Sequence, residues 1–176
     1  MTGSAIRAIV AFPHLQPDDR HWLESIREKH DPQAKVIAAH FTLVFPSVLP
    51  PRTTESHVAR IAQAAEPVRF VLRRAAVVAD AHGAGGHVFL IPEEGRDGLT
   101  QLHNRLHDGP FVSLRPSSTF TPHVTIAAKT PVAPLHLLAA GLNAKAINMR
   151  GSISELVLVE VTASAIEMVA HFQLGG

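Results

Sequence analysis

The sequence of 176 residues has no cysteine and no tyrosine, and tryptophan occurs only once. The lack of cysteine excludes disulfide bonds, thiolate zinc sites and a cysteine nucleophile. Aromatic residues make up 5 % of the chain and form no cluster beside basic residues, so a platform for long single-stranded RNA is not indicated. The net charge of +1, counted with neutral histidine, favours neither duplex DNA nor an anionic membrane as a partner.

The chain also lacks a long hydrophobic run. Its most apolar stretch, 132–149, is interrupted by Pro134, His136 and Lys145 and is too polar to cross a bilayer. The N-terminal residues do not show the basic and apolar regions of a signal peptide. With 46 % hydrophobic and 18 % charged residues, the composition is that of one globular domain over 1–176, which we expect to be a cytoplasmic monomer.

What the sequence does contain is a repeated tetrapeptide. HFTL at 40–43 and HVTI at 123–126 share the order His, apolar, Thr, apolar. Side chains alternate between the two faces of a strand, so each imidazole shares a face with its hydroxyl while the apolar pair lies on the other. The side chains that would meet in a cleft, and that we take as candidate catalytic residues, are those of His40, Thr42, His123 and Thr125.

The triplet His-x-Thr alone is a weak signal, because 12 His and 10 Thr in 176 residues give about 0.7 such triplets by chance. Its weight comes from the strand-like composition around both copies and from their matching places in a repeated order of elements. Ala5 precedes His40 by 35 positions, and His87 precedes His123 by 36.

The repeated order is strand, helix, motif strand, helix, strand. Apolar or alternating runs predict strands at 5–12, 36–45, 68–78, 87–91, 121–127, 154–162 and 166–174. Capping and first-turn residues predict helices that begin at Pro17, at Thr53 or Thr54, at Asp97 and at Thr130–Pro131. We therefore predict an α+β, bilobal, pseudo-two-fold duplicated fold, with antiparallel sheets lining a central cleft and helices outside. The lobes would be 1–80 and 87–176, sharing one cleft.

The two tetrapeptides, 83 positions apart, and the FTPH lead-in at 120–123 resemble the 2H phosphoesterase superfamily. This superfamily includes 2′-5′ RNA ligase-like proteins and cyclic phosphodiesterases. The resemblance implies a bilobal fold with both motifs in a central cleft. It also implies hydrolysis of 2′,3′-cyclic or related phosphodiesters without a metal or other cofactor, on a small nucleotide or an RNA terminus.

The sequence departs from the family pattern after the second motif. Relatives often carry arginine five positions after the second histidine, where this chain has Ala128 followed by Lys129. By strand alternation, Lys129 would share a face with His123, Thr125 and Ala127. Lys129 is therefore a candidate for substrate contact at the rim of the cleft.

The residue types fit acid–base chemistry at a phosphate. Imidazole titrates near pH 6.5, so one neutral and one protonated histidine can coexist near neutrality. One would take a proton from water and the other would protonate the leaving oxygen, while the threonine hydroxyls donate hydrogen bonds to the non-bridging oxygens. The sequence leaves open which histidine is the base.

Two alternatives come from other classes of protein. The same fold could bind a nucleotide or an RNA end without turnover. His103 and His107, four positions apart on a predicted helix, have a spacing that can chelate a metal, although we expect them on the solvated side of the leucine stripe. Phe41 and Phe45 are expected to point into the core.

Overall fold

The computed structural model describes residues 5–50, 52–80, 83–129, 131–163 and 165–175. The strands are β1 (Ile6–Ala11), β2 (His14–Leu15), β3 (Phe41–Val48), β4 (Val68–Ala79), β5 (Gly86–Glu94), β6 (Val124–Lys129), β7 (Met149–Ile153), β8 (Glu155–Val161) and β9 (Ile166–Gln173). The helices are α1 (Pro17–His30), α2 (Thr54–Gln63), α3 (Arg96–Leu106) and α4 (Ala133–Asn143), with 3₁₀ turns η1 (Pro32–Lys35) and η2 (Gly109–Leu114). Among the described residues, no helix combines the length and the apolar composition needed to cross a membrane.

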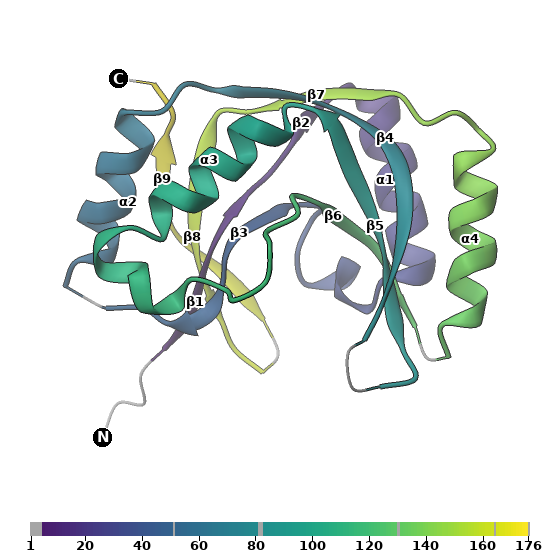
Figure 1. The fold of residues 1–176 in the computed structure, drawn as a ribbon, viewed down its shortest axis with the longest axis horizontal. Coiled ribbons are helices and arrows are strands. Elements are labelled where there is room, and N and C mark those ends of the chain that lie inside the picture. Colours follow the sequence, from purple (N-terminus) through teal and green to yellow (C-terminus); the bar gives the residue numbers. More distant parts are fainter. Residues whose placement is uncertain (1–4, 51, 81–82, 130, 164, 176) are drawn as a thin grey trace.

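The strands form one antiparallel sheet in the order β2-β7-β4-β5-β6-β3-β1-β8-β9 (Figure 1). The sheet is narrowest in the middle, where β3 pairs with β6 only through Phe41 and Val124. This junction separates a group of strands around β1 from a group around β5. Each group draws on both halves of the chain, since β8 and β9 extend from β1 while β4 pairs with β5. The predicted α+β bilobal fold is confirmed.

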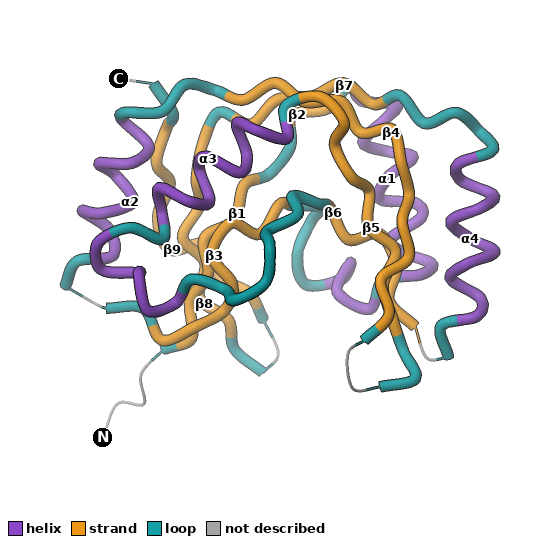
Figure 2. The backbone as a smooth tube through the Cα atoms, viewed as in Figure 1, coloured by secondary structure: helices purple, strands orange, loops and turns teal. Residues whose placement is uncertain are grey.

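Helices cover the outside of both groups of strands (Figure 2). α2 contacts β8 and β9, and α3 contacts β3; α1 contacts β6, and α4 contacts β4, β5 and β6. α1, which follows β1 and β2, therefore packs on β6, and α3, which follows β5, packs mainly on β3. Leu99, Leu102 and Leu106 form the buried face of α3, as their spacing predicts. The contacts of α1 with β6 and of α3 with β3 therefore connect the two groups of strands in addition to the pairing of β3 with β6.

Hydrophobic residues are buried on both faces of the strands around β1. The main core lies between the sheet and the helices and contains Ile9, Leu43 and Ile126. A smaller cluster lies on the other face of β1 and β8 and contains Ala8, Val10, Val157 and Val159. Ala8, Val10 and Val159 of this second cluster form part of one wall of the cavity described below.

Several element boundaries differ from the predicted ones. The first motif strand begins at Phe41. It continues through Pro46, which has no N–H to donate, because the register of β1 and β3 shifts at this position and the proline is not required to form a hydrogen bond between the strands. α3 follows Gly95, whose φ of 79° is left-handed, so the helix begins before Asp97. α4 begins at Ala133, and Thr130 lies outside the described residues. The short strands β2 and β7 were not predicted, since neither has an alternating apolar pattern.

Candidate functional site

The two motif histidines lie at the junction between the two groups of strands. His40 immediately precedes β3 and His123 immediately precedes β6. The next residues, Phe41 and Val124, are the pair that joins these strands, and both are completely buried. The pairing of Phe41 with Val124 therefore brings together the two segments, far apart in the sequence, in which a histidine precedes a strand.

A cavity of about 500 Å³ lies at this junction and is lined by all four candidate catalytic residues, His40, Thr42, His123 and Thr125. In both motifs the threonine is partly exposed, whereas the residues on either side of it are buried. The alternation expected from the sequence thus holds within each tetrapeptide.

A β-bulge follows the threonine in β3. Thr42 pairs with Val10 and Val44 pairs with Ile9, so Leu43 has no partner of its own on β1. Leu43 and Val44 both enter the core, and the next residue, Phe45, returns to the cavity with 42 % of its surface exposed. The prediction that Phe45 points into the core is wrong for this reason, while Phe41 is completely buried as predicted.

The same bulge recurs in β6. Thr125 pairs with Phe89 and Ala127 pairs with Val88, which leaves Ile126 as the extra residue. Ala127 is buried in the core and Ala128 lines the cavity, so Ala127 does not share a face with Thr125. Lys129 follows at the exposed end of β6, outside the set of described residues that line this cavity.

Both imidazoles are held in the same orientation by their own backbone. Nδ1 of His40 lies 2.8 Å from the carbonyl oxygen of Ala38, and Nδ1 of His123 lies 2.7 Å from that of Thr121. A carbonyl oxygen can only accept, so Nδ1 is the donor in each ring. Nε2 of each histidine is then left to take up or release a proton.

Burial lowers the pKa of both His40 and His123, and the hydrogen bond to the backbone carbonyl acts in the opposite direction at each. For His40, the charge of Arg27 lowers the pKa further, Asp31 raises it, and His123 lowers it. For His123, the charge of His87 lowers the pKa further. Because a charge on His123 opposes protonation of His40, the site favours one charged ring at a time.

Aromatic rings pack against both histidines. Phe89 stacks on His123 with ring centroids 3.7 Å apart, and His87 stacks on Phe89 at 5.7 Å. Phe12 meets His40 edge-on at 6.2 Å. The sequence does not identify Phe89 as a site residue, because its position beside His123 depends on the pairing between β5 and β6.

His103 and His107 are buried, with 2 % and 1 % of their surfaces exposed, so the prediction that they lie on the solvated side of α3 is wrong. Nδ1 of His103 donates to the carbonyl oxygen of Leu43 at 2.8 Å, and its ring stacks on Phe120 at 3.8 Å. The phenylalanine of the FTPH lead-in therefore anchors the segment before His123 to α3. Within the described part of the chain, no three His, Cys, Asp or Glu side chains are grouped to hold a metal ion.

Acid is expected to destabilise this fold. Burial lowers the pKa of His103 to about 4, despite the opposing hydrogen bond to Leu43. The unfolded chain, in which histidine titrates near pH 6.5, then binds more protons than the native state, so the free energy of unfolding falls as the pH decreases between these values. Complete protonation of His103 corresponds to about 3 kcal/mol, at roughly 1.4 kcal/mol per pKa unit.

Urea unfolding at about pH 7 and pH 5, where most carboxylates stay ionised, measures this effect. The pKa of His107 is also lowered by burial, so it adds a contribution of the same sign. His103→Gln, which cannot titrate, is expected to flatten the dependence. If the unfolding free energy falls equally between pH 7 and pH 5 in both proteins, His103 is not the source of the pH dependence.

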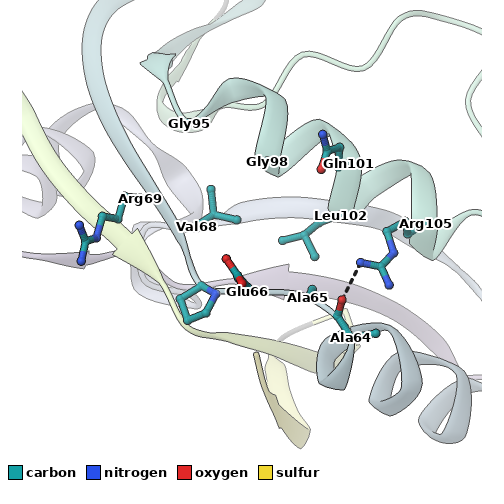
Figure 3. A pocket seen from close by; sticks show the side chains of 11 residues that line it. Ala64, Ala65, Glu66, Val68, Arg69, Gly95, Gly98, Gln101, Leu102 and Arg105 are labelled. Carbon is teal, nitrogen blue, oxygen red and sulfur yellow. Dashed lines mark hydrogen bonds between the residues drawn. The ribbon is translucent and has the colours of Figure 1, made fainter. Parts of the chain in front are cut away.

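A second cavity of about 440 Å³ lies where the end of α2 and the start of β4 face α3 (Figure 3). Its polar lining includes Glu66, Arg69 and Gln101, and Nη1 of Arg105 donates to the carbonyl oxygen of Ala64 at 3.0 Å. Neither motif histidine lines it. The candidate acid–base groups are therefore confined to the first cavity.

Comparison with known proteins places these observations in a family. The family model described as the 2′-5′ RNA ligase superfamily matches residues 13–164. No curated protein sequence matches the chain.

Solved structures match over nearly the whole chain. LigT from E. coli in complex with 3′-AMP is 19 % identical, with a TM-score of 0.62 and coverage of 98 % of this chain and 99 % of LigT. Usb1 from Kluyveromyces marxianus with uridine monophosphate is 10 % identical, with a TM-score of 0.58 and coverage of 97 % and 99 %. At these identities the similarity establishes the fold, and the family follows from the match over 13–164: the chain belongs to the 2′-5′ RNA ligase superfamily of 2H phosphoesterases.

Proposed function

We propose that this protein is a metal-independent phosphoesterase that hydrolyses 2′,3′-cyclic phosphodiesters of nucleotides or RNA ends by two-histidine acid–base catalysis. The observation that carries the proposal is the convergence of His40, Thr42, His123 and Thr125 on one cavity. Membership of a phosphoesterase superfamily supports it. The structures of LigT with 3′-AMP and of Usb1 with uridine monophosphate also support it, because they are nucleotide complexes of proteins with this fold.

The reaction needs two proton transfers at one phosphate. A water oxygen forms a bond to phosphorus, and the bond from phosphorus to the ribose 2′ or 3′ oxygen breaks. Nε2 of the neutral histidine takes the proton from water, and Nε2 of the protonated histidine gives its proton to the ribose oxygen. The product is a phosphate monoester beside a free hydroxyl, and the two histidines have exchanged protonation states.

The cavity also offers a surface for the organic part of a nucleotide. Its wall on the side of β1 and β8 is formed by Val10, Val159 and Val161, with the exposed ring of Phe45 beside Thr42. A flat heterocycle can pack on such a surface while its phosphate lies between the histidines. Lys129 would contact a substrate that extends beyond the cavity, as an RNA end does.

Incubation of the wild-type protein with 2′,3′-cyclic AMP in the presence of EDTA tests the proposal. We expect conversion to a nucleoside monophosphate, detected by chromatography. If no member of a panel of 2′,3′-cyclic nucleotides is hydrolysed, the proposal is wrong. Hydrolysis that EDTA abolishes would contradict the metal-independent mechanism.

Removal of one threonine hydroxyl is expected to slow catalysis. Thr125→Val keeps the shape of the side chain but removes the donor to the non-bridging oxygens, so kcat should fall about 10²-fold with a smaller change in KM. Thr100→Val is the matched control, because Thr100 Oγ1 bonds to the carbonyl oxygen of Arg96 on α3, outside the cavity. Equal kcat values for the two variants would remove the threonine from the proposed mechanism.

A further inference from the structure

Three charged residues at the C-terminal part of α1 form a network beside the cavity. The guanidinium of Arg27, which is 1 % exposed, binds Asp31 through Nε at 3.0 Å and Nη2 at 2.9 Å, and binds Glu24 through Nη1 at 2.9 Å. Arg27 and Asp31 also line the cavity. We refer to Glu24, Arg27 and Asp31 as the α1 triad.

The α1 triad holds the segment that leads into His40. Nη2 of Arg27 donates to the carbonyl oxygen of Ile37 at 3.0 Å, and Oε1 of Glu24 accepts from the backbone N–H of Ala39 at 2.7 Å. Residues 36–40 belong to neither η1 nor β3. Backbone hydrogen bonds to Gln33 hold Val36 and Ile37, and the two contacts of the α1 triad hold the carbonyl of Ile37 and the N–H of Ala39.

The contact of Glu24 reaches His40 through one peptide group. The N–H of Ala39, bound by Glu24, and the C=O of Ala38, which accepts from Nδ1 of His40, belong to the same peptide unit. A peptide unit is planar, so fixing its N–H also fixes the direction of its C=O. A carboxylate bound to the N–H also polarises the unit and strengthens the carbonyl as an acceptor.

The corresponding arrangement is absent at the second histidine for a covalent reason. The carbonyl that accepts from Nδ1 of His123 belongs to Thr121, and the nitrogen of that peptide unit is that of Pro122, which has no N–H. A carboxylate relay of the same kind cannot form there. The pseudo-symmetric site is thus chemically asymmetric.

We propose that Glu24 is a positioning residue for His40, acting through the Ala38–Ala39 peptide unit and held in place by Arg27. It keeps the His40 ring in the tautomer with hydrogen on Nδ1, so that Nε2 faces the substrate. The importance of this role for catalysis rests on the proposed function, whereas the tautomer itself can be measured on the free protein.

The test compares Glu24→Ala with Glu24→Gln and with Glu160→Ala. Glu160 is the matched control, because it is a glutamate of similar exposure, 33 % against 29 %, that also pairs with an arginine. Nitrogen-15 spectra of the imidazoles report the tautomer of each histidine. In Glu24→Ala we expect His40 to become a mixture of tautomers while His123 is unchanged, and in Glu24→Gln, which keeps an acceptor for Ala39, a smaller change. Glu160→Ala should affect neither ring.

In the same Glu24→Ala protein, kcat for a 2′,3′-cyclic nucleotide should fall about 10-fold to 100-fold, with little change in KM. A folded Glu24→Ala protein in which the His40 tautomer is unchanged would overturn the proposal, as would equal changes at His40 and His123. The tautomer result stands even if the wild-type protein hydrolyses no cyclic nucleotide, so failure of the proposed function and failure of this inference are distinguishable.

Discussion

Alanine at either motif histidine is expected to lower kcat/KM for a 2′,3′-cyclic nucleotide by about 10²–10⁴-fold, the usual contribution of a positioned general acid or base. His40→Ala and His123→Ala should have losses of similar size, because in the proposed mechanism both proton transfers serve the same displacement at phosphorus. Among the described residues, each imidazole hydrogen-bonds only to a carbonyl of its own preceding segment, so its removal leaves no distant buried polar group without a partner. The loss should therefore appear in kinetics and not in folding.

Steady-state kinetics of the purified variants measure this prediction, with His171→Ala as the control. His171 lies on β9 with its side chain about half exposed and bound to Glu155, away from the cavity. Its replacement should leave kcat/KM unchanged. If either motif variant keeps wild-type kcat/KM, the histidines do not form an acid–base pair.

Replacement of Arg27 by methionine is expected to cost about 3–5 kcal/mol of unfolding free energy, because it leaves a buried carboxylate without its partner. The side chain of Asp31 is 3 % exposed and its Oδ2 depends on Arg27. The same change also removes the donor to the carbonyl oxygen of Ile37. Methionine retains most of the apolar volume of the arginine stem, so the loss reports the charge and its hydrogen bonds.

Arg73→Met is the matched control for this change. Arg73 pairs with Glu94 at 2.6 Å, but the two side chains are 32 % and 54 % exposed, and such pairs contribute about 1 kcal/mol or less. Urea unfolding of both variants against the wild type gives the two free-energy differences. Losses of equal size would contradict the structural role assigned to Arg27.

The sequence was sufficient to predict the features that depend on local periodicity. Alternation within each tetrapeptide places His and Thr on one side and the apolar pair in the core, and the structure has this arrangement. The leucine spacing likewise predicts the buried face of α3. The matching distances from Ala5 to His40 and from His87 to His123 indicate the repeated architecture, which the strand order confirms.

Features that depend on pairing between distant segments could not be predicted. The bulges after Thr42 and Thr125 shift the side chains that directly follow them to the opposite face, which places Phe45 and Ala128 in the cavity. A bulge arises from the register against the neighbouring strand, and no residue in either motif predicts it. The burial of His103 has the same origin, since its partner Leu43 lies 60 positions away.

The asymmetry of the two histidines also lies beyond the motifs. The residues that differ are Glu24 on a helix and Pro122 in the lead-in, and only the fold brings Glu24 to the backbone before His40. A duplicated site can thus keep two His-x-Thr motifs and still give its two imidazoles different support.

If both imidazoles act on one phosphate, a single bound phosphate must change the ring signals of both histidines, which a ligand titration measures. A nucleoside 2′- or 3′-monophosphate, a product of the proposed reaction, is added to protein with isotope-labelled histidine. We expect the signals of His40 and His123 to shift together along one saturable binding curve while that of His171 stays in place. A shift of only one motif histidine, or two separate binding curves, would contradict it.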